Sequence, residues 1–515
     1  MNQPGADLIL YNANVLTPDT RIPRTSQAQI VAIRGDRIMG VGWERKSYSG
    51  PETKFLDCQG GTLVPGFNDA HCHILSYIKG LLSLDCSPGR VRSIEEIKSL
   101  LRKRAEQGPP GTWILGAGYN DFYLAERRHP NRMDLDEAAP LHPVKLNYRT
   151  AHACVLNSPA LKRAGITIET PDPPGGLIDR DPGTGEPTGI LYEMGPYISR
   201  RAAIPPLNPR ELAEGVALAE EHYLSLGITS LQDAGQNNDP GRWDLFREIK
   251  ERNELTPRLS LMMGISALDE LKDRGLGPRY GDDWLRLGAL KVVIDESTGS
   301  MLPPPEELRR LVRRAVREGF QVALHAIEES QVEAAAGALE HAGGETLRHR
   351  IEHCSECPPH LLERLKRVGA VVVTQPAFIY YSGERYLSQV PPSRLPWLYR
   401  IGSFLEHGLR PVASSDSPVV PLDPLKGIYA AATRRAETGQ ALSPHEAVTP
   451  HQALEMYTLA PAYASGDEDI KGSLRAGMLA DLALLSADPT RVPVEEIKEI
   501  QVNMTVAGGR VVWEA

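Results

Sequence analysis

The sequence lacks long hydrophobic runs and an excess of positive charge. No 18 consecutive apolar residues occur anywhere in its 515 residues, so we expect no membrane-spanning segment. The formal net charge of −9 argues against nucleic acid and anionic membrane surfaces as main partners. Residues 1–7 contain neither a basic nor an apolar region, so we also expect no secretory signal.

Cysteine is scarce as well. Six cysteines in a chain of this length do not make a disulfide framework, and they fit the reduced thiols of a cytoplasmic protein. Cys354 and Cys357 form a lone CxxC sequence with no second pair. We interpret them as two ordinary thiols rather than as a zinc or redox site.

Both ends of the chain predict short β-strands. Residues 7–16, 29–34 and 37–42 are rich in β-branched and apolar residues. The same pattern recurs at residues 481–485 and 502–513. Neither end alone supplies enough strands for a stable sheet with a buried face. We therefore predict one β-sandwich domain built from residues 1–65 plus 470–515.

The middle of the chain alternates predicted strands with predicted amphipathic helices, which indicates a (β/α)8 TIM-like barrel within residues 66–469. The eight candidate strands are 62–69, 227–233, 258–264, 287–294, 320–325, 348–353, 369–374 and 410–415. The segment between the first two strands far exceeds a normal βα loop of about two to six residues. We expect an inserted subdomain there, at about 74–225, folding over the barrel mouth.

Two histidines follow the first barrel strand. The apolar run stops at Pro65-Gly66, and Asp69, His71 and His73 come directly after it. Alternate side chains of an extended strand share a face, so His71 and His73 point into the same space. Imidazole suits zinc, and catalytic zinc is held by few protein ligands with one position left open.

A lysine lies inside the predicted strand at residues 287–294. An unpaired lysine in a strand that is buried on both faces is costly, so Lys291 has two interpretations. In the first interpretation, Lys291 pairs with Asp295, which lies two pleats further along the strand on the same face. Alternatively, burial lowers the amine pKa from about 10.4, and the neutral amine reacts with carbon dioxide. We favour the resulting carbamate, whose two oxygens can bridge two cations.

Three further polar residues close later strands: His325, His353 and Asp416. Taken singly, each histidine fits a satisfied core residue and Asp416 fits a helix cap. Together with His71, His73 and Lys291 they all fall at strand ends, which meet at one barrel mouth. This convergence predicts a divalent-metal centre. Glu352 should face away from His353, and we interpret it as a carboxylate that supports the ligands.

The sequence resembles the amidohydrolase superfamily, and within it the metal-dependent amidohydrolase group 3, the YtcJ-like group. The segments that carry the resemblance are Val64–His73, Leu156–Leu161, Gly227–Asp233, Ile351–His353, Ser415–Pro418 and Lys471–Leu482. The resemblance implies that His71 and His73 bind the more buried metal and that His325 and His353 bind the more exposed one. It further implies a bridging carbamate on Lys291, with Asp416 as both metal ligand and proton shuttle.

The sequence departs from the group near the expected substrate. Asp295-Glu296 stands where the group has Asp-Gly, Ala326-Ile327-Glu328 follows His325 in place of Gly-Asp, and Arg149-Thr150-Ala151-His152 replaces Asp-Gly-His. We expect His152, Asp295 and Glu296 to contact substrate, although a packing role for His152 is an equal alternative.

The resemblance implies a metal-dependent hydrolase of a non-peptide C–N bond in a small amide, formamide, cyclic amide or N-acyl compound. The same site can also serve a deaminase, a decarboxylase or a lactone or ester hydrolase, since a fold does not fix its chemistry. A non-catalytic amidohydrolase-like assembly protein is the third alternative. Two zinc ions are expected, with iron, manganese or cobalt as substitutes, and a homo-oligomer is compatible with the sequence.

Overall fold

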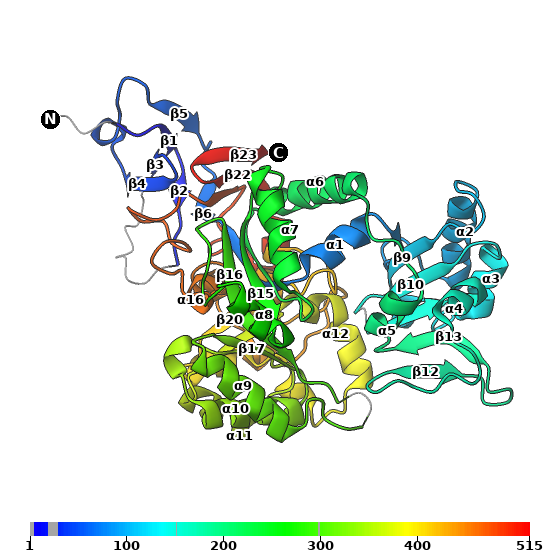
Figure 1. Ribbon diagram of the computed structural model, residues 1–515. Coiled ribbons are helices and arrows are strands. Elements are labelled where there is room, and N and C mark those ends of the chain that lie inside the picture. The colour runs from blue at the N-terminus through cyan, green and yellow to red at the C-terminus, as the bar shows by residue number, and fades with distance from the viewer. Residues whose placement is uncertain (1–4, 19–28, 151, 297–298) are drawn as a thin grey trace.

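The computed structural model describes residues 5–18, 29–150, 152–296 and 299–515. Its centre is a sheet of eight parallel strands in the order β20-β19-β18-β17-β16-β15-β14-β7. These strands are β7 (Phe67–Cys72), β14 (Ile228–Asp233), β15 (Arg258–Gly264), β16 (Leu285–Val293), β17 (Val322–Ala326), β18 (Arg350–His353), β19 (Val371–Thr374) and β20 (Pro411–Ala413). The predicted TIM-like barrel is confirmed (Figure 1).

Backbone hydrogen bonds beyond the ends of β7 and β20 close the barrel. The Asp416 amide donates to the His71 carbonyl over 2.8 Å, and the His73 amide donates to the Ser417 carbonyl over 2.8 Å. Both bonds join segments that carry predicted site residues. Closure of the barrel and placement of the site therefore depend on the same contacts.

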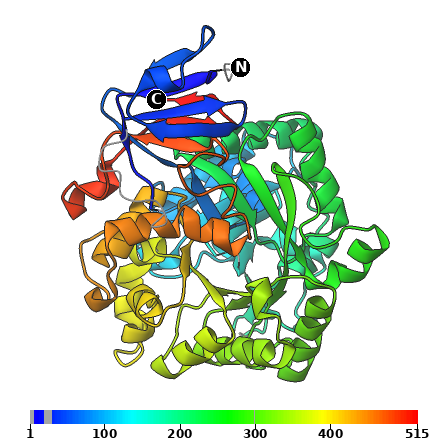
Figure 2. The same ribbon diagram turned by 90° about the vertical axis from the view of Figure 1, so that its left-hand side faces the viewer.

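Helices surround the barrel strands, as Figure 2 shows. They are α1 (Ile74–Leu81), α6 (Pro209–Ser225), α7 (Pro240–Glu251), α8 (Leu268–Asp273), α9 (Pro305–Arg317), α10 (Glu329–Ala342), α11 (Pro359–Arg367), α12 (Ala377–Gln389), α13 (Ile401–Glu406), α14 (Pro424–Thr433), α15 (Pro450–Met456) and α16 (Leu459–Ala464). Their starts are encoded locally. In α6, Asn208 caps the helix, Pro209 occupies its first turn and Glu211 completes a capping box.

The predicted first barrel strand is two strands. Residues Thr62–Pro65 form β6, which pairs with a C-terminal strand, and the barrel strand β7 begins only at Phe67. Gly66 lies between them, where a Cβ atom would come within 2.1 Å of Thr229 Oγ1. Only glycine allows this close approach, so the chain changes sheets at Pro65-Gly66.

Strands from both chain ends form two sheets beside the barrel (Figures 1 and 2). The first, β4-β3-β1-β5, contains only β1 (Leu8–Tyr11), β3 (Ile30–Arg34), β4 (Arg37–Gly42) and β5 (Lys54–Asp57). The second, β2-β6-β21-β22-β23, joins β2 (Asn14–Val15) and β6 to β21 (Leu482–Leu485), β22 (Val502–Ala507) and β23 (Arg510–Glu514). The predicted domain limits stay a proposal.

A buried ion pair ties these sheets to the barrel. Arg258, at the start of β15, donates from Nε and Nη2 to the two carboxylate oxygens of Asp481, over 2.6 and 3.1 Å. Both side chains are almost completely buried. Such a two-bond arginine–carboxylate pair fixes orientation as well as distance.

Between β7 and β14 the chain forms a further sheet, β12-β13-β11-β10-β9-β8, which lies to one side of the barrel (Figure 1). Its strands are β8 (Leu84–Asp85), β9 (Ile114–Tyr119), β10 (Val144–Tyr148), β11 (Ala153–Leu156), β12 (Leu177–Arg180) and β13 (Pro187–Tyr192). Its helices are α2 (Ile94–Ala105), α3 (Arg132–Ala138), α4 (Ser158–Ala164) and α5 (Gly195–Arg201). We call this layer the inserted sheet.

No helix in the described part of the chain is both long and apolar enough to cross a membrane. All six cysteines are buried and unpaired, including Cys354 and Cys357.

Candidate metal centre

Four histidine rings from three barrel strands lie against one another at the barrel mouth. The ring centroid of His71 lies 5.4 Å from that of His73 and 4.8 Å from that of His353. The His325 ring lies 4.5 Å from the His353 ring. The sequence predicts this convergence from strand ends alone, and the structure brings the four residues together.

Asp416 completes one side of this group. Its Oδ1 atom lies 3.1 Å from His73 Nε2 and 3.5 Å from His71 Nε2. Although burial alone raises the pKa of Asp416, the hydrogen bond from His73 and the neighbouring histidines hold that pKa well below its usual range. Asp416 is therefore an ionised carboxylate beside two imidazoles.

A buried network orients His71. Its Nδ1 atom lies 2.5 Å from Glu352 Oε2, so the ring donates there and leaves Nε2 directed toward Asp416. Arg350 Nε and Nη2 donate to the same carboxylate over 2.6 and 3.0 Å, and Arg350 Nη1 donates to Gln232 Oε1. The interpretation of Glu352 as a supporting carboxylate agrees with this geometry. Burial and the charge of Lys291 also keep the pKa of His71 well below 6.5.

His353 has a support of its own. Gln375 Oε1 lies 3.0 Å from His353 Nδ1, and Gln375 Nε2 donates to Ser414 Oγ over 2.9 Å. An amide oxygen only accepts, so His353 donates from Nδ1 and keeps Nε2 free for a ligand. His353 and Asp416 both have positive φ angles, 71° and 55°, which non-glycine residues seldom adopt.

Lys291, on β16, is buried. Its Nζ atom has no hydrogen-bond partner among the described residues, Asp295 included. Burial lowers the pKa of Lys291 to about 8, against the opposing influence of Glu352 and Asp416. The pairing with Asp295 that the sequence left open is therefore not formed.

The three predicted substrate contacts do not belong to this group of rings, although His152 lies next to it. His152, in the inserted sheet's segment before β11, is 52% exposed and lies 2.7 Å from Glu193, and its ring is 6.5 Å from that of His325. The hydrogen bond that His152 donates to Glu193 raises the pKa of His152. Asp295 exchanges backbone hydrogen bonds with Leu302, and Glu296 accepts a 2.5 Å hydrogen bond from Ser330 Oγ. Their contact with substrate stays a prediction.

The donor set fits a divalent metal. Donor atoms of His71, His73 and Asp416 lie within 4.8 Å of one another. Neutral imidazole nitrogens and an ionised carboxylate are the ligands that zinc and similar ions take, and the other ring nitrogen of His71 and of His353 is already held by a polar partner. The buried Lys291 amine, which has no hydrogen-bond partner among the described residues, is a candidate for one further ligand.

The sequence did not point to Asp69, Arg350 or Gln375 as support for the site. Asp69 accepts hydrogen bonds from the Ser415 amide and hydroxyl over 2.9 and 2.5 Å, which fixes the loop that carries Asp416. Burial raises the pKa of Asp69 to about 6. An acid two residues before His71 was the only available signal, because these pairings join distant strands.

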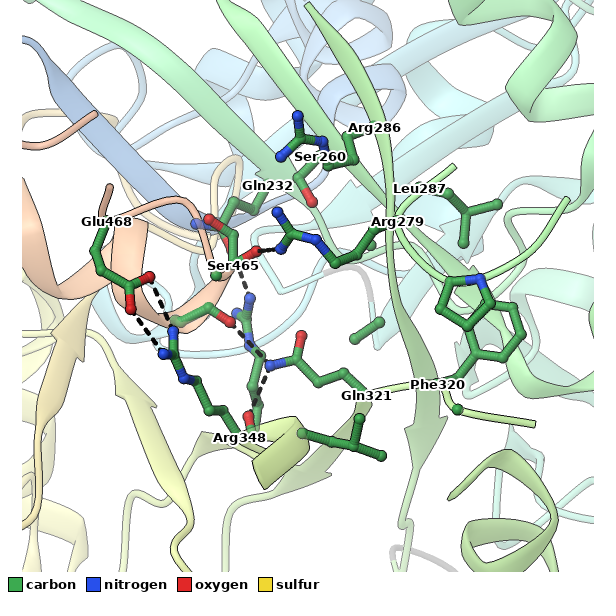
Figure 3. Close-up of a pocket in the computed structure, with 18 of the residues that line it drawn as sticks. Gln232, Ser260, Arg279, Arg286, Leu287, Phe320, Gln321, Arg348, Ser465 and Glu468 are labelled. Carbon is green, nitrogen blue, oxygen red and sulfur yellow. Dashed lines mark hydrogen bonds and ion pairs between the residues drawn. The ribbon is translucent and has the colours of Figure 1, made fainter. Parts of the chain in front are cut away.

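A cavity of about 380 Å³ lies at the opposite end of the barrel, near the starts of β15, β16 and β18 (Figure 3). Its arginines are paired, and the figure shows Arg348 bound to Glu468. Gln232 and Arg350 line this cavity and also belong to the network behind His71. The cavity therefore lies next to the residues that support the metal centre from behind, and it does not open at the barrel mouth.

Comparison with known proteins agrees with this arrangement. The family model described as "Amidohydrolase family" matches residues 54–513. N-substituted formamide deformylase of Arthrobacter pascens is 30% identical, over 99% of this chain and 98% of that protein. YtcJ of Bacillus subtilis (strain 168), named as an amidohydrolase, is 27% identical over 96% of this chain and 98% of that protein.

Solved structures agree as well. An uncharacterized metal-dependent hydrolase from Pyrococcus furiosus has a TM-score of 0.73 and 25% identity, over 94% of this chain and all of that chain. With a family match across most of its length, the chain belongs to the amidohydrolase family of metal-dependent hydrolases.

Proposed function

We propose that this protein hydrolyses a non-peptide C–N bond in a small amide, formamide, cyclic amide or N-acyl compound, with Asp416 as the proton shuttle. The observation that carries the proposal is the placement of an ionised Asp416 within 3.1–3.5 Å of two imidazole Nε2 atoms at the barrel mouth. The formamide deformylase relative supports a C–N bond as the target.

His71, His73 and Asp416 would hold one divalent ion, and His325 and His353 a second. Lys291 would contribute to both as a carbamate, formed when its neutral amine adds to carbon dioxide and releases a proton. Zinc is the expected ion, with iron, manganese or cobalt as substitutes. When bound, such ions lower the pKa of water and polarise a carbonyl group.

The protein's own groups move the proton. Asp416 accepts a proton from the attacking water and gives it to the leaving nitrogen, so that amide and water become a carboxylic acid and an amine. Glu352 and Gln375 hold His71 and His353 in fixed orientations during this step. The buried network behind the histidines leaves little to reorganise when charge develops.

The test is hydrolysis of a panel of formamides, N-acyl amines, cyclic amides and lactones by protein loaded with zinc, manganese or iron. Amine release measures cleavage of the C–N substrates, and acid release measures cleavage of the lactones. We expect hydrolysis of at least one C–N substrate by the wild type. Cleavage of lactones alone, or of no compound, would refute the proposed bond specificity.

The carbamate needs a separate measurement. Native mass spectrometry of the metal-loaded protein should show the mass of one added carbon dioxide, about 44 Da, on the lysine amine. Lys291→Met should remove this added mass. An unmodified native mass would refute the carbamate.

A further inference from the structure

Two arginines lie near the contact between the inserted sheet and the barrel. Arg149 directly follows β10 of the inserted sheet, and Arg385 lies on the barrel helix α12. The inserted layer contacts α12, because the Tyr123 hydroxyl donates to the Tyr381 carbonyl over 3.4 Å, and Tyr381 lies one helical turn before Arg385. The Arg149 amide donates to the carbonyl of Tyr119, four residues before Tyr123, over 3.1 Å.

Neither arginine has a carboxylate partner. Among the described residues, no ion pair involves Arg149 or Arg385, and the Nε atom of each is shielded from solvent without a hydrogen-bond partner. By contrast Arg258, Arg350 and Arg348 are each paired with an acid. A half-buried guanidinium whose N–H donor makes no hydrogen bond lowers the stability of the fold, unless an anion accepts that hydrogen bond.

Arg149 lies beside the candidate metal centre. Its Nη1 atom donates to the Val419 carbonyl over 3.4 Å, and the Val419 amide donates to the Asp416 carbonyl over 2.9 Å. His152 follows Arg149 by three residues, and its ring lies 6.5 Å from that of His325. The guanidinium therefore lies against the loop that carries the proton shuttle.

The arginines share their surroundings. Burial raises the pKa of Tyr148, and the positive charges of Arg149 and Arg385 both oppose that rise. The nearby acids Asp121, Glu384 and Glu437 act on Tyr148 or Tyr123, yet none forms an ion pair with either arginine. The charges of both arginines therefore act on Tyr148 and on Tyr123.

We propose that Arg149 and Arg385 bind a carboxylate of the substrate, which makes the substrate an N-acyl amine that carries an acid group, such as an N-acyl amino acid. This inference rests on the proposed function. The planar guanidinium matches a carboxylate through two parallel hydrogen bonds, and the inserted sheet brings this recognition site to the reacting bond. Arg149 and Arg385 then determine specificity and do not move protons.

The test compares two substrates with the same scissile bond, N-formylphenylalanine and N-formyl-2-phenylethylamine, at fixed ionic strength. Metal-loaded wild type should show kcat/KM about 30-fold or more in favour of the carboxylate, which is the scale of a shielded charge pair. Arg149→Gln and Arg385→Gln should each reduce that preference about 10-fold. Arg149→Lys should retain part of it, because the charge remains.

Tyr123→Phe is the matched control. It removes a hydrogen bond at the same junction without changing charge, so it should leave the preference within about twofold. An equal loss of preference in Tyr123→Phe would show that a loosened junction, rather than the charge, explains the arginine variants, and would overturn the proposal.

A binding measurement separates this inference from the proposed function. Calorimetry with 3-phenylpropanoate and 3-phenylpropan-1-ol requires no turnover, and wild type should bind only the acid, with an affinity that Arg149→Gln and Arg385→Gln weaken about 10-fold. If no formamide is cleaved but this binding pattern holds, the proposed reaction fails and the anion site stands. Acid binding that is unchanged in both variants would overturn the anion site.

Discussion

The barrel strand ends and the inserted sheet contribute to the same mouth in different ways. On the barrel, His71, His353 and Asp416 are buried, and each is held by a partner on another strand. On the inserted sheet, His152 is half exposed and Arg149 has an unused donor. Under the proposed function, the barrel would fix the chemistry, whereas the inserted sheet would select the compound.

The largest expected effect tests the barrel side. Asp416→Asn removes the proton acceptor but keeps an oxygen near His73, so kcat should fall about 1,000-fold while bound metal is retained. Asp423→Asn is the control, since Asp423 caps α14 and pairs with Lys426 at the surface of that helix, and asparagine caps equally well. A kcat near that of wild type in Asp416→Asn would remove Asp416 from the mechanism.

The next effect concerns the network behind the ligands. Arg350→Met leaves the buried Glu352 carboxylate without its cation, so the free energy of unfolding should fall by about 3–5 kcal/mol. Denaturant unfolding of the metal-free protein measures this change. Arg364→Met, which breaks only exposed ion pairs with Glu333 and Glu340, should cost about 1 kcal/mol or less. Equal costs for both variants would contradict the role of Arg350.

A smaller effect is expected at His353. Gln375→Ala removes the acceptor for His353 Nδ1, so metal affinity should fall about 10- to 100-fold. Competition with a chromophoric chelator measures the affinity. Gln375→Glu keeps an acceptor at the same place and should retain most of it. Unchanged affinity in Gln375→Ala would show that the ring needs no such support.

The smallest effect tests the inserted sheet. His152→Gln should raise KM by about 10-fold or less and leave kcat nearly unchanged, because an exposed contact contributes to binding and not to proton transfer. Steady-state kinetics on the best substrate of the panel measures both constants. A large fall in kcat with unchanged KM would place His152 among the reacting groups and would erase the contrast between the two regions.

The sequence predicted the barrel and the convergence of its polar strand ends because both follow from local pattern. An apolar run that ends in His325 or His353 is visible without a partner. The sequence could not predict the hydrogen-bond partners of Glu352 and Gln375, because these bonds join segments that are far apart in the chain. Arg149 was visible only as a departure from the family pattern, and its missing partner appears only in three dimensions.

Metal analysis of the purified protein tests the central claim most directly. After supply with zinc, manganese or iron and removal of the excess, elemental analysis should find two divalent ions per wild-type chain and fewer in His71→Asn and Lys291→Met. A wild-type protein that stays metal-free under these conditions would contradict the proposed hydrolase.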